Sequence, residues 1–139
     1  MTIQISRKCE YALKAMIFIA GLKDGELYTA KTVSGSERIP LKFLEKILQS
    51  LVSHGLLRVT YGPKGGYRLS RVAKDISFRD IIEAVEGPMR LNLCVGHEPE
   101  CDGQDCSMKS HWERLQGEVE ALFEKTTLAE AIKSPARVR

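Results

Sequence analysis

The sequence predicts a mainly α-helical protein that contains one small β-hairpin. Three observations support this fold class: apolar residues recur at helical spacing in several segments, two short β-type runs flank a glycine-rich turn at 62–66, and a long amphipathic segment follows a cysteine-containing loop. At 139 residues, with a hydrophobic content of 43%, the chain has enough material for one compact domain and an appended arm.

The first half contains three segments with the apolar spacing of helices. Residues 6–22 lack glycine and proline before their final two residues and predict a helix that is buried on more than one side. A shorter helix begins after Thr29, whose side chain suits an N-cap, and is expected to end at 35–36. Over 40–53, Pro40 suits the first turn, and leucines at i, i+4 and i+7 lie opposite a polar, mostly basic face.

Two strands are predicted next, over 56–61 and 67–70, joined by the sequence Gly-Pro-Lys-Gly-Gly. A short helix, a turn, an amphipathic helix and a basic hairpin thus follow one another in the order of a winged helix-turn-helix domain. Ser77 and Asp80 then predict a capping box at the start of another helix, which ends at 87–88.

The last third combines a cysteine-containing loop over 88–106 with a long helix that is expected to begin at Ser107. An apolar seam repeats along this helix at spacings of 3, 4 and 3, formed by Trp112, Leu115, Val119 and Leu122. Because a small wing domain has little surface left to cover such a helix, we expect it to pair with a second chain and form a homodimer. Packing against its own domain is the alternative.

These patterns divide the chain into four parts. We predict a winged helix-turn-helix domain at 1–87, a cysteine-rich loop at 88–106, a dimerisation helix with a C-terminal segment at 107–132, and a loose basic tail at 133–139. No apolar run approaches the ~20 residues that cross a bilayer, and the N-terminus lacks the order of a signal peptide. A cytoplasmic protein with no membrane partner is therefore expected.

Charge is divided unequally between the two halves of the chain. Residues 1–75 hold 13 basic and 6 acidic residues, a net charge of +7, whereas 76–139 hold 8 basic and 12 acidic residues, a net charge of −4. Within 38–74, eight basic residues accompany one acidic residue, Glu45. This distribution is typical of a surface that binds phosphate, and an ordinary solvated surface is the alternative.

Double-stranded DNA is the partner that this surface predicts, with the 40–53 helix in the major groove, where base edges can be distinguished. The candidate base readers on its polar face are Lys42, Glu45, Lys46 and Gln49. The candidates for DNA contacts from the hairpin are Tyr61, Lys64 and Arg68. A dimer must place two such helices about 34 Å apart, which predicts a palindromic operator. An ordinary hairpin without a DNA contact is the alternative.

Four cysteines in a reducing compartment more often indicate metal, cofactor or redox chemistry than structural disulfides. Three of them, Cys94, Cys101 and Cys106, form a C-x6-C-x4-C pattern in the loop. Thiolates bind iron strongly and need no regular backbone, so an iron–sulfur cluster fits this pattern. Zinc completed by His97 or His111 and unligated redox thiols are the alternatives, although the C-x2-C spacing of structural zinc sites is absent.

Three segments also carry a family resemblance: ISRKCEYALKAM, the stretch from IPLKFLEK through GPKGGYRLSR, and the three-cysteine loop followed by HWERL. They resemble the IscR/NsrR-type family of winged-helix iron–sulfur repressors over almost the whole chain, most specifically in the GPKGGYRL hairpin and the cysteines after it. The resemblance implies a dimer in which the last helix crosses its mate. It also implies a 4Fe-4S or 2Fe-2S cluster whose state controls the affinity for DNA.

The resemblance bears on the fourth cluster ligand as well. Family members with a 2Fe-2S cluster use a histidine three residues after the third cysteine, where this chain has Lys109. Other members use a carboxylate near the start of the partner's first helix, directly before an aromatic residue. Glu10 before Tyr11 matches that place, so Glu10 of the partner subunit is the expected ligand, and an exposed helix acid is the alternative. Weaker candidates are His97, His111 and Cys9.

The hairpin departs from the family as well, because many relatives carry arginine at Tyr61 and glycine at Lys64; the resemblance therefore does not extend to minor-groove reading. The predicted function is a repressor that senses iron, redox or nitric oxide status through its cluster. A regulator of the same fold without a cluster, sensing a thiol state or a small metabolite, and a small electron-transfer protein are the alternatives. An enzyme is not expected, because no nucleophile–base pair or nucleotide-binding loop is found.

Overall fold

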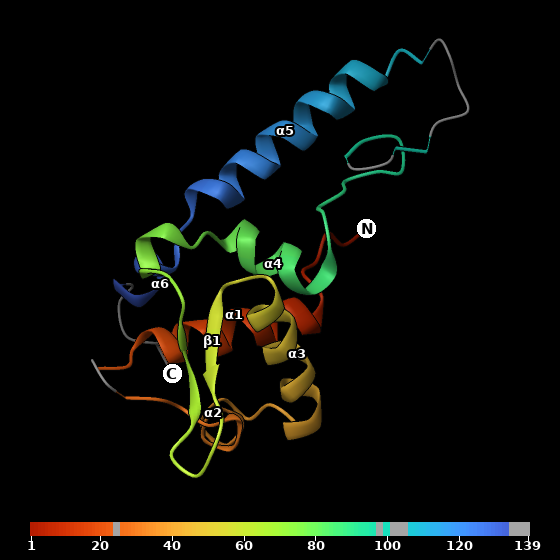
Figure 1. Ribbon diagram of the computed structural model, residues 1–139. Coiled ribbons are helices and arrows are strands. Elements are labelled where there is room, and N and C mark those ends of the chain that lie inside the picture. Colours follow the sequence, from red (N-terminus) through yellow and green to blue (C-terminus); the bar gives the residue numbers. More distant parts are fainter. Residues whose placement is uncertain (24–25, 97–98, 101–105, 134–139) are drawn as a thin grey trace.

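The computed structural model describes residues 1–23, 26–96, 99–100 and 106–133, so the predicted basic tail after Lys133 lies outside the described part. Its elements are α1 (Arg7–Ala20), α2 (Ala30–Glu37), α3 (Leu41–Ser53), β1 (Leu57–Thr60), β2 (Gly66–Leu69), the short 3-10 helix η1 (Ala73–Asp75), α4 (Phe78–Glu86), α5 (Lys109–Lys125) and α6 (Leu128–Lys133). This mainly helical chain with one two-stranded antiparallel sheet confirms the predicted fold class (Figure 1).

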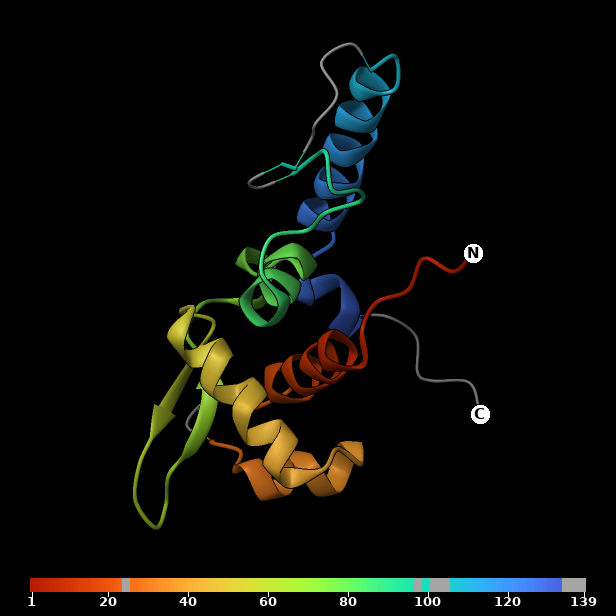
Figure 2. The same ribbon diagram turned by 90° about the vertical axis from the view of Figure 1, so that its right-hand side faces the viewer.

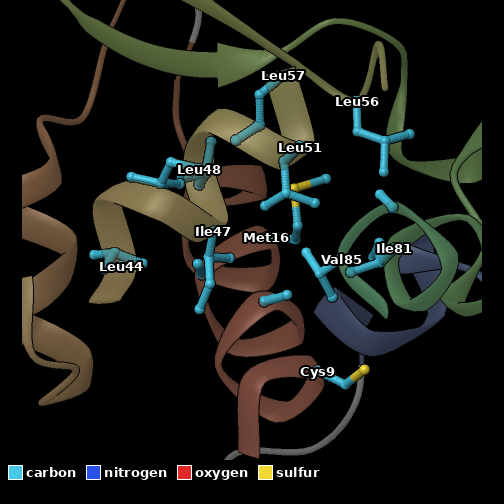
Figure 3. Close-up of a cluster of buried hydrophobic side chains, with 14 of the residues drawn as sticks. Cys9, Met16, Leu44, Ile47, Leu48, Leu51, Leu56, Leu57, Ile81 and Val85 are labelled. Atoms are coloured by element: carbon cyan, nitrogen blue, oxygen red, sulfur yellow. The ribbon is translucent and has the colours of Figure 1, made fainter. Parts of the chain in front are cut away.

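The hydrophobic core lies between α1, α3 and α4 (Figure 3). Helix α1 begins at Ser6, whose side chain accepts a hydrogen bond from the Cys9 amide at 3.2 Å, and is buried on more than one side, as predicted. The buried residues of α1 are Cys9, Ala12, Ala15, Met16 and Ile19. Those of α3 are Leu44, Ile47, Leu48 and Leu51.

Helix α2 continues past the predicted end at 35–36, so that prediction is wrong. Gly35 lies inside the helix, at a cost of about 1 kcal/mol relative to alanine, which the burial of Val33 in the core offsets. The helix ends at Arg38, which takes a left-handed conformation with φ of 57°. The hydroxyl of Ser34 then donates to the carbonyl oxygen of Ile39 at 2.5 Å, which holds the turn that leads into α3.

The two strands pair in antiparallel register. Strand β1 is one residue shorter at each end than the predicted 56–61, and β2 begins and ends one residue before the predicted 67–70. Tyr28 adds a bridge to β2 that the sequence did not predict. The Tyr67 amide donates to the Tyr28 carbonyl oxygen at 2.7 Å, and the Tyr28 amide donates back at 3.1 Å. A Cβ at Gly66 would lie 2.7 Å from that Tyr28 oxygen, and a Cβ at Gly65 would overlap the carbonyl oxygen of Thr60. Packing therefore requires both glycines.

Helix α4 begins with the predicted capping box: the Asp80 amide donates to the Ser77 hydroxyl, and the Ser77 amide donates to the Asp80 carboxylate, both at 3.0 Å. The last long helix begins at Lys109 instead of the predicted Ser107. Helix α5 projects away from the body of the molecule, by which we mean the part built around α1, α3 and α4. The chain then returns to this body through α6 (Figures 1 and 2). Within the described part of the chain, no helix combines the length and apolar character that crossing a membrane requires.

Candidate DNA-binding surface and cysteine loop

Helix α3 presents its predicted base readers to solvent. All four, Lys42, Glu45, Lys46 and Gln49, are exposed, whereas the leucines and isoleucine between them are buried. The helix is thus fixed to the body by one face and leaves the other free along its whole length. Because an α-helix fits the width of the major groove, this free face has the form and the charge for reading base edges.

The hairpin, or wing, carries a second basic surface. Tyr61 is 87% exposed beside the turn, and Lys64 and Arg68 are exposed as well. Arg58 on β1 lies directly opposite Arg68 on β2, and both are exposed. Two like charges in register destabilise a sheet, and a bound phosphate would offset that cost. Arg58 belongs to the basic stretch 38–74 but was not among the predicted hairpin contacts, and the strand register makes it a further candidate.

The candidate DNA-binding surface and the cysteine loop lie at different ends of the molecule. The wing tip, α2 and the start of α3 are at one end, and α5 with the loop beside it is at the other (Figures 1 and 2). Helix α4 lies between the two ends and packs against α1, α3 and α5. Helix α4 thus provides one direct path between the two ends.

The structure describes two of the three loop cysteines. Cys94 is partly buried, and its sulfur lies 3.6 Å from the side-chain nitrogen of Asn92. Cys106 is exposed just before α5, where its carbonyl oxygen accepts from the Lys109 amide at 3.3 Å. The predicted ligands Cys101 and His97 lie outside the described residues. Among the residues that are described, no group of three side chains forms a metal site.

The other fourth-ligand candidates have different surroundings. Glu10 is exposed in the first turn of α1, 3.8 Å from the Lys14 ammonium, and its carboxylate is free to face another chain. His111 is exposed near the start of α5. Cys9 is 2% exposed, and burial raises the pKa of its thiol. A metal binds the thiolate, so this environment disfavours Cys9 as a ligand.

The cysteine loop fits an iron–sulfur cluster in its donor chemistry. Cys94 and Cys106 are both free thiols, and both have exposed surface, so no core packing has to be broken to reach them. Soft sulfur donors on an irregular segment are the ligands that such clusters use. The loop is held at its start by Gln116 of α5, whose side chain is 4% exposed and bonds to the backbone at 89–91. Sequence reasoning missed this residue.

Comparison with known proteins identifies the family. The family model Rrf2, described as an iron-dependent transcriptional regulator, matches residues 5–134. The chain belongs to the Rrf2 family. IscR of Cereibacter sphaeroides is 31% identical to this Rrf2 protein over 140 residues, which cover 97% of this chain and 90% of the relative.

Solved structures agree with this assignment. IscR of T. potens superposes with a TM-score of 0.79 at 26% identity, covering 100% of this chain and 94% of that one. The oxidized form of Staphylococcus aureus CymR gives a TM-score of 0.76 at 27% identity, covering 97% and 100%. These relatives confirm the predicted family and the winged-helix fold, and this Rrf2 protein is a helix-turn-helix transcriptional regulator.

Proposed function

We propose that this Rrf2 protein is a homodimeric repressor whose affinity for a palindromic operator is controlled by an iron–sulfur cluster that reports iron, redox or nitric oxide status. One observation carries the proposal: two accessible thiols lie in the loop that precedes the projecting helix α5, and the basic surface of α3 and the wing lies at the other end of the molecule. Sensing and DNA contact are thus assigned to separate regions that α4 connects.

The proposed ligands are Cys94, Cys101 and Cys106, with Glu10 of the partner subunit as the fourth. When bound, the cluster would supply a redox-active centre to the loop. Glu10 supports this assignment because its carboxylate is exposed, and its ion pair with Lys14, at 3.8 Å, is long and lies in solvent. Next to it, Tyr11 packs edge-on against Phe43 of α3, with ring centroids 5.6 Å apart, so the first turn of α1 contacts the proposed DNA-reading helix.

Dimerisation through α5 is the second part of the proposal. Leu122 is 64% exposed and Leu115 is 38% exposed, and Trp112 and Val119 are half-buried. A second copy of the helix would remove this seam from water. The angle between two wing domains would then depend on α5, and a change of a few ångströms in their separation alters how well they meet successive major grooves.

The cluster is tested by Cys94→Ala and Cys106→Ala, with Ser107→Ala as the matched control beside Cys106. Anaerobically purified wild type and Ser107→Ala are expected to be brown and to contain iron and acid-labile sulfide. The two cysteine variants are expected to lose most of both, and their binding to a panel of promoter fragments should differ from that of the loaded protein. A colourless wild type, or cysteine variants with full iron content and unchanged DNA affinity, contradicts the proposal.

The subunit origin of the fourth ligand is tested by mixing two defective chains, Glu10→Gln and Cys106→Ala. If Glu10 serves the partner's cysteines, the mixed dimer holds one intact site and one doubly defective site. It should bind about half the iron of wild type. If Glu10 serves its own chain, both sites of the mixed dimer are defective and the iron content stays at the level of the single variants.

A cluster-free thiol sensor is the second candidate function. The exposure of Cys106 and the partial exposure of Cys94 favour it, because oxidants reach such thiols directly. It predicts a colourless protein whose DNA affinity changes with hydrogen peroxide and returns with a thiol reductant. The same promoter panel, measured on metal-free protein before and after oxidation, distinguishes this regulator from the proposed one.

A further inference from the structure

Gln116 is a polar side chain in a place where an apolar one would be expected. It lies on α5 and is 4% exposed, and it is the one residue of that helix, described throughout its length, that is buried. Its Nε2 donates to the carbonyl oxygen of Met89 at 2.8 Å, and its Oε1 accepts from the amide of Leu91 at 2.8 Å. We name this pair of bonds the loop anchor.

A neighbouring carboxylate supports the loop anchor from α4. Glu83 accepts from the Met89 amide at 3.1 Å through one oxygen, and its other oxygen lies 3.3 Å from Nε of Arg79. Arg79 also donates to Glu120 of α5 at 2.8 Å. The first residues of the cysteine loop are therefore bonded to α4 and α5 together, and these two helices are bonded to each other.

The chemistry of the loop anchor indicates positioning more than packing. Burying an amide costs desolvation free energy that only well-formed hydrogen bonds recover, and an apolar side chain would fill the same space without that cost. Both polar side-chain atoms of Gln116 bond to the backbone at 89–91, a segment distant in sequence. These two bonds fix the position and direction of that segment. Cys94 follows Leu91 by three residues, so its Cα stays within about 10 Å of the anchor.

We propose that Gln116 is a positioning residue of the cysteine site: it fixes the start of the loop on α5 and thereby keeps Cys94 partly shielded beside that helix. The identity of the group that Cys94 binds rests on the proposed function, whereas the positioning of Cys94 does not. The same bonds link the position of a proposed ligand to α5, the helix that sets the relation between two subunits in that proposal.

Thiol alkylation of the metal-free, reduced full-length protein tests the positioning. Gln116→Leu removes both bonds, and Gln116→Glu keeps the acceptor for Leu91 but removes the donor to Met89. Glu118→Gln, an exposed position on the same helix, is the matched control. Rates are followed with iodoacetamide and mass spectrometry, and cleavage after glutamate separates Cys94 from the later cysteines because Glu98 and Glu100 lie between them.

The three described thiols report different events. The alkylation rate of Cys94 is expected to rise about tenfold in Gln116→Leu, the size that the loss of a buried hydrogen bond gives, with a smaller rise in Gln116→Glu and none in the control. The rate of exposed Cys106 should change less than about twofold, and buried Cys9 should stay unreactive. An unchanged Cys94 rate, or equal rises at Cys94 and Cys9, overturns the proposal because the latter reports general unfolding.

Iron release provides a second readout that separates this proposal from the function it extends. In reconstituted protein, a chelator should remove iron about tenfold faster from Gln116→Leu than from wild type. Faster alkylation with unchanged iron release would overturn the role of Gln116 in the cluster site. If wild type binds no iron, the proposed function fails, and the alkylation rates still decide whether Gln116 positions Cys94.

Discussion

Helices α3 and α5 are both amphipathic, but they are held by different forces. Helix α3 has 13 residues and buries four apolar side chains, whereas α5 has 17 residues and buries only the amide of Gln116. The first is fixed by apolar contacts inside the chain. The second is attached mainly by ion pairs from Arg79 and by hydrogen bonds, with Phe123 partly buried against the core, and it leaves Leu122 64% exposed. The difference shows that α3 is held mainly by the apolar core, whereas α5 leaves its apolar seam exposed or half-buried.

The largest effect is expected from a core truncation in α3. Leu48→Ala removes a fully buried side chain and should lower the free energy of unfolding by about 3 kcal/mol. The matched change on α5, Leu122→Ala, should lower it by less than about 0.5 kcal/mol in the monomer. Urea denaturation over a series of protein concentrations separates folding from association. Equal losses at low concentration would remove the contrast between the two helices.

A charge on the α5 seam tests whether a second copy covers it. Leu122→Glu should raise the dimer dissociation constant about 100-fold, because a symmetric interface receives the carboxylate twice. Analytical ultracentrifugation measures it, with Glu118→Gln as the control on the same helix. A monomeric wild type, or a Leu122→Glu dimer as tight as wild type, would mean that a second α5 does not cover this seam.

A change at the start of α4, the helix between α3 and α5, should have an intermediate effect on stability. Ser77→Ala removes the hydroxyl that accepts from the Asp80 amide at the start of α4 and should cost about 1 kcal/mol of stability. Ser107→Ala, which caps no helix, should cost almost nothing. Thermal unfolding compares the two variants, and an equal shift of Tm in both would show that the capping box contributes little.

The smallest effect on stability is expected from Arg58→Ala in the wing. Removing one of two opposed arginines should leave the free energy of unfolding within about 0.5 kcal/mol of wild type or raise it slightly. The slope of log binding constant against log salt concentration should meanwhile fall by about one unit on every promoter fragment. Lys125→Ala on α5 is the control. A similar fall in its salt slope would mean that DNA contacts α5, which contradicts binding through α3 and the wing.

The sequence predicted what local chemistry determines. The amphipathic character of α3 follows from leucine spacing, and the capping box of α4 follows from Ser77 and Asp80, because each needs only neighbours along the chain. The end of α2 was predicted wrongly for the opposite reason. Gly35 is a good helix terminator by local preference, but here the left-handed cap forms at Arg38, whose amide donates to the Ser34 carbonyl oxygen, so the helix continues beyond that glycine.

The features that were missed all join distant parts of the chain. Gln116 bonds to a segment 25–27 residues before it, and no local pattern distinguishes it from the polar residues around it. The Arg58 and Arg68 pair needs the exact strand register, which a turn of five residues leaves open. The proposed ligands Cys94, Cys101, Cys106 and Glu10 stay predictions from the thiol pattern and the family resemblance.

The crowding at the wing glycines has a practical consequence for engineering new operator preferences. Gly65 and Gly66 have no room for a side chain, and Gly62 takes a φ of 111° that other residues rarely adopt. Tyr61, Pro63 and Lys64 are exposed and carry no such restriction. A combinatorial library that randomises those three positions and retains the glycines should therefore yield mostly folded clones, so that selection acts on DNA preference instead of on survival of the scaffold.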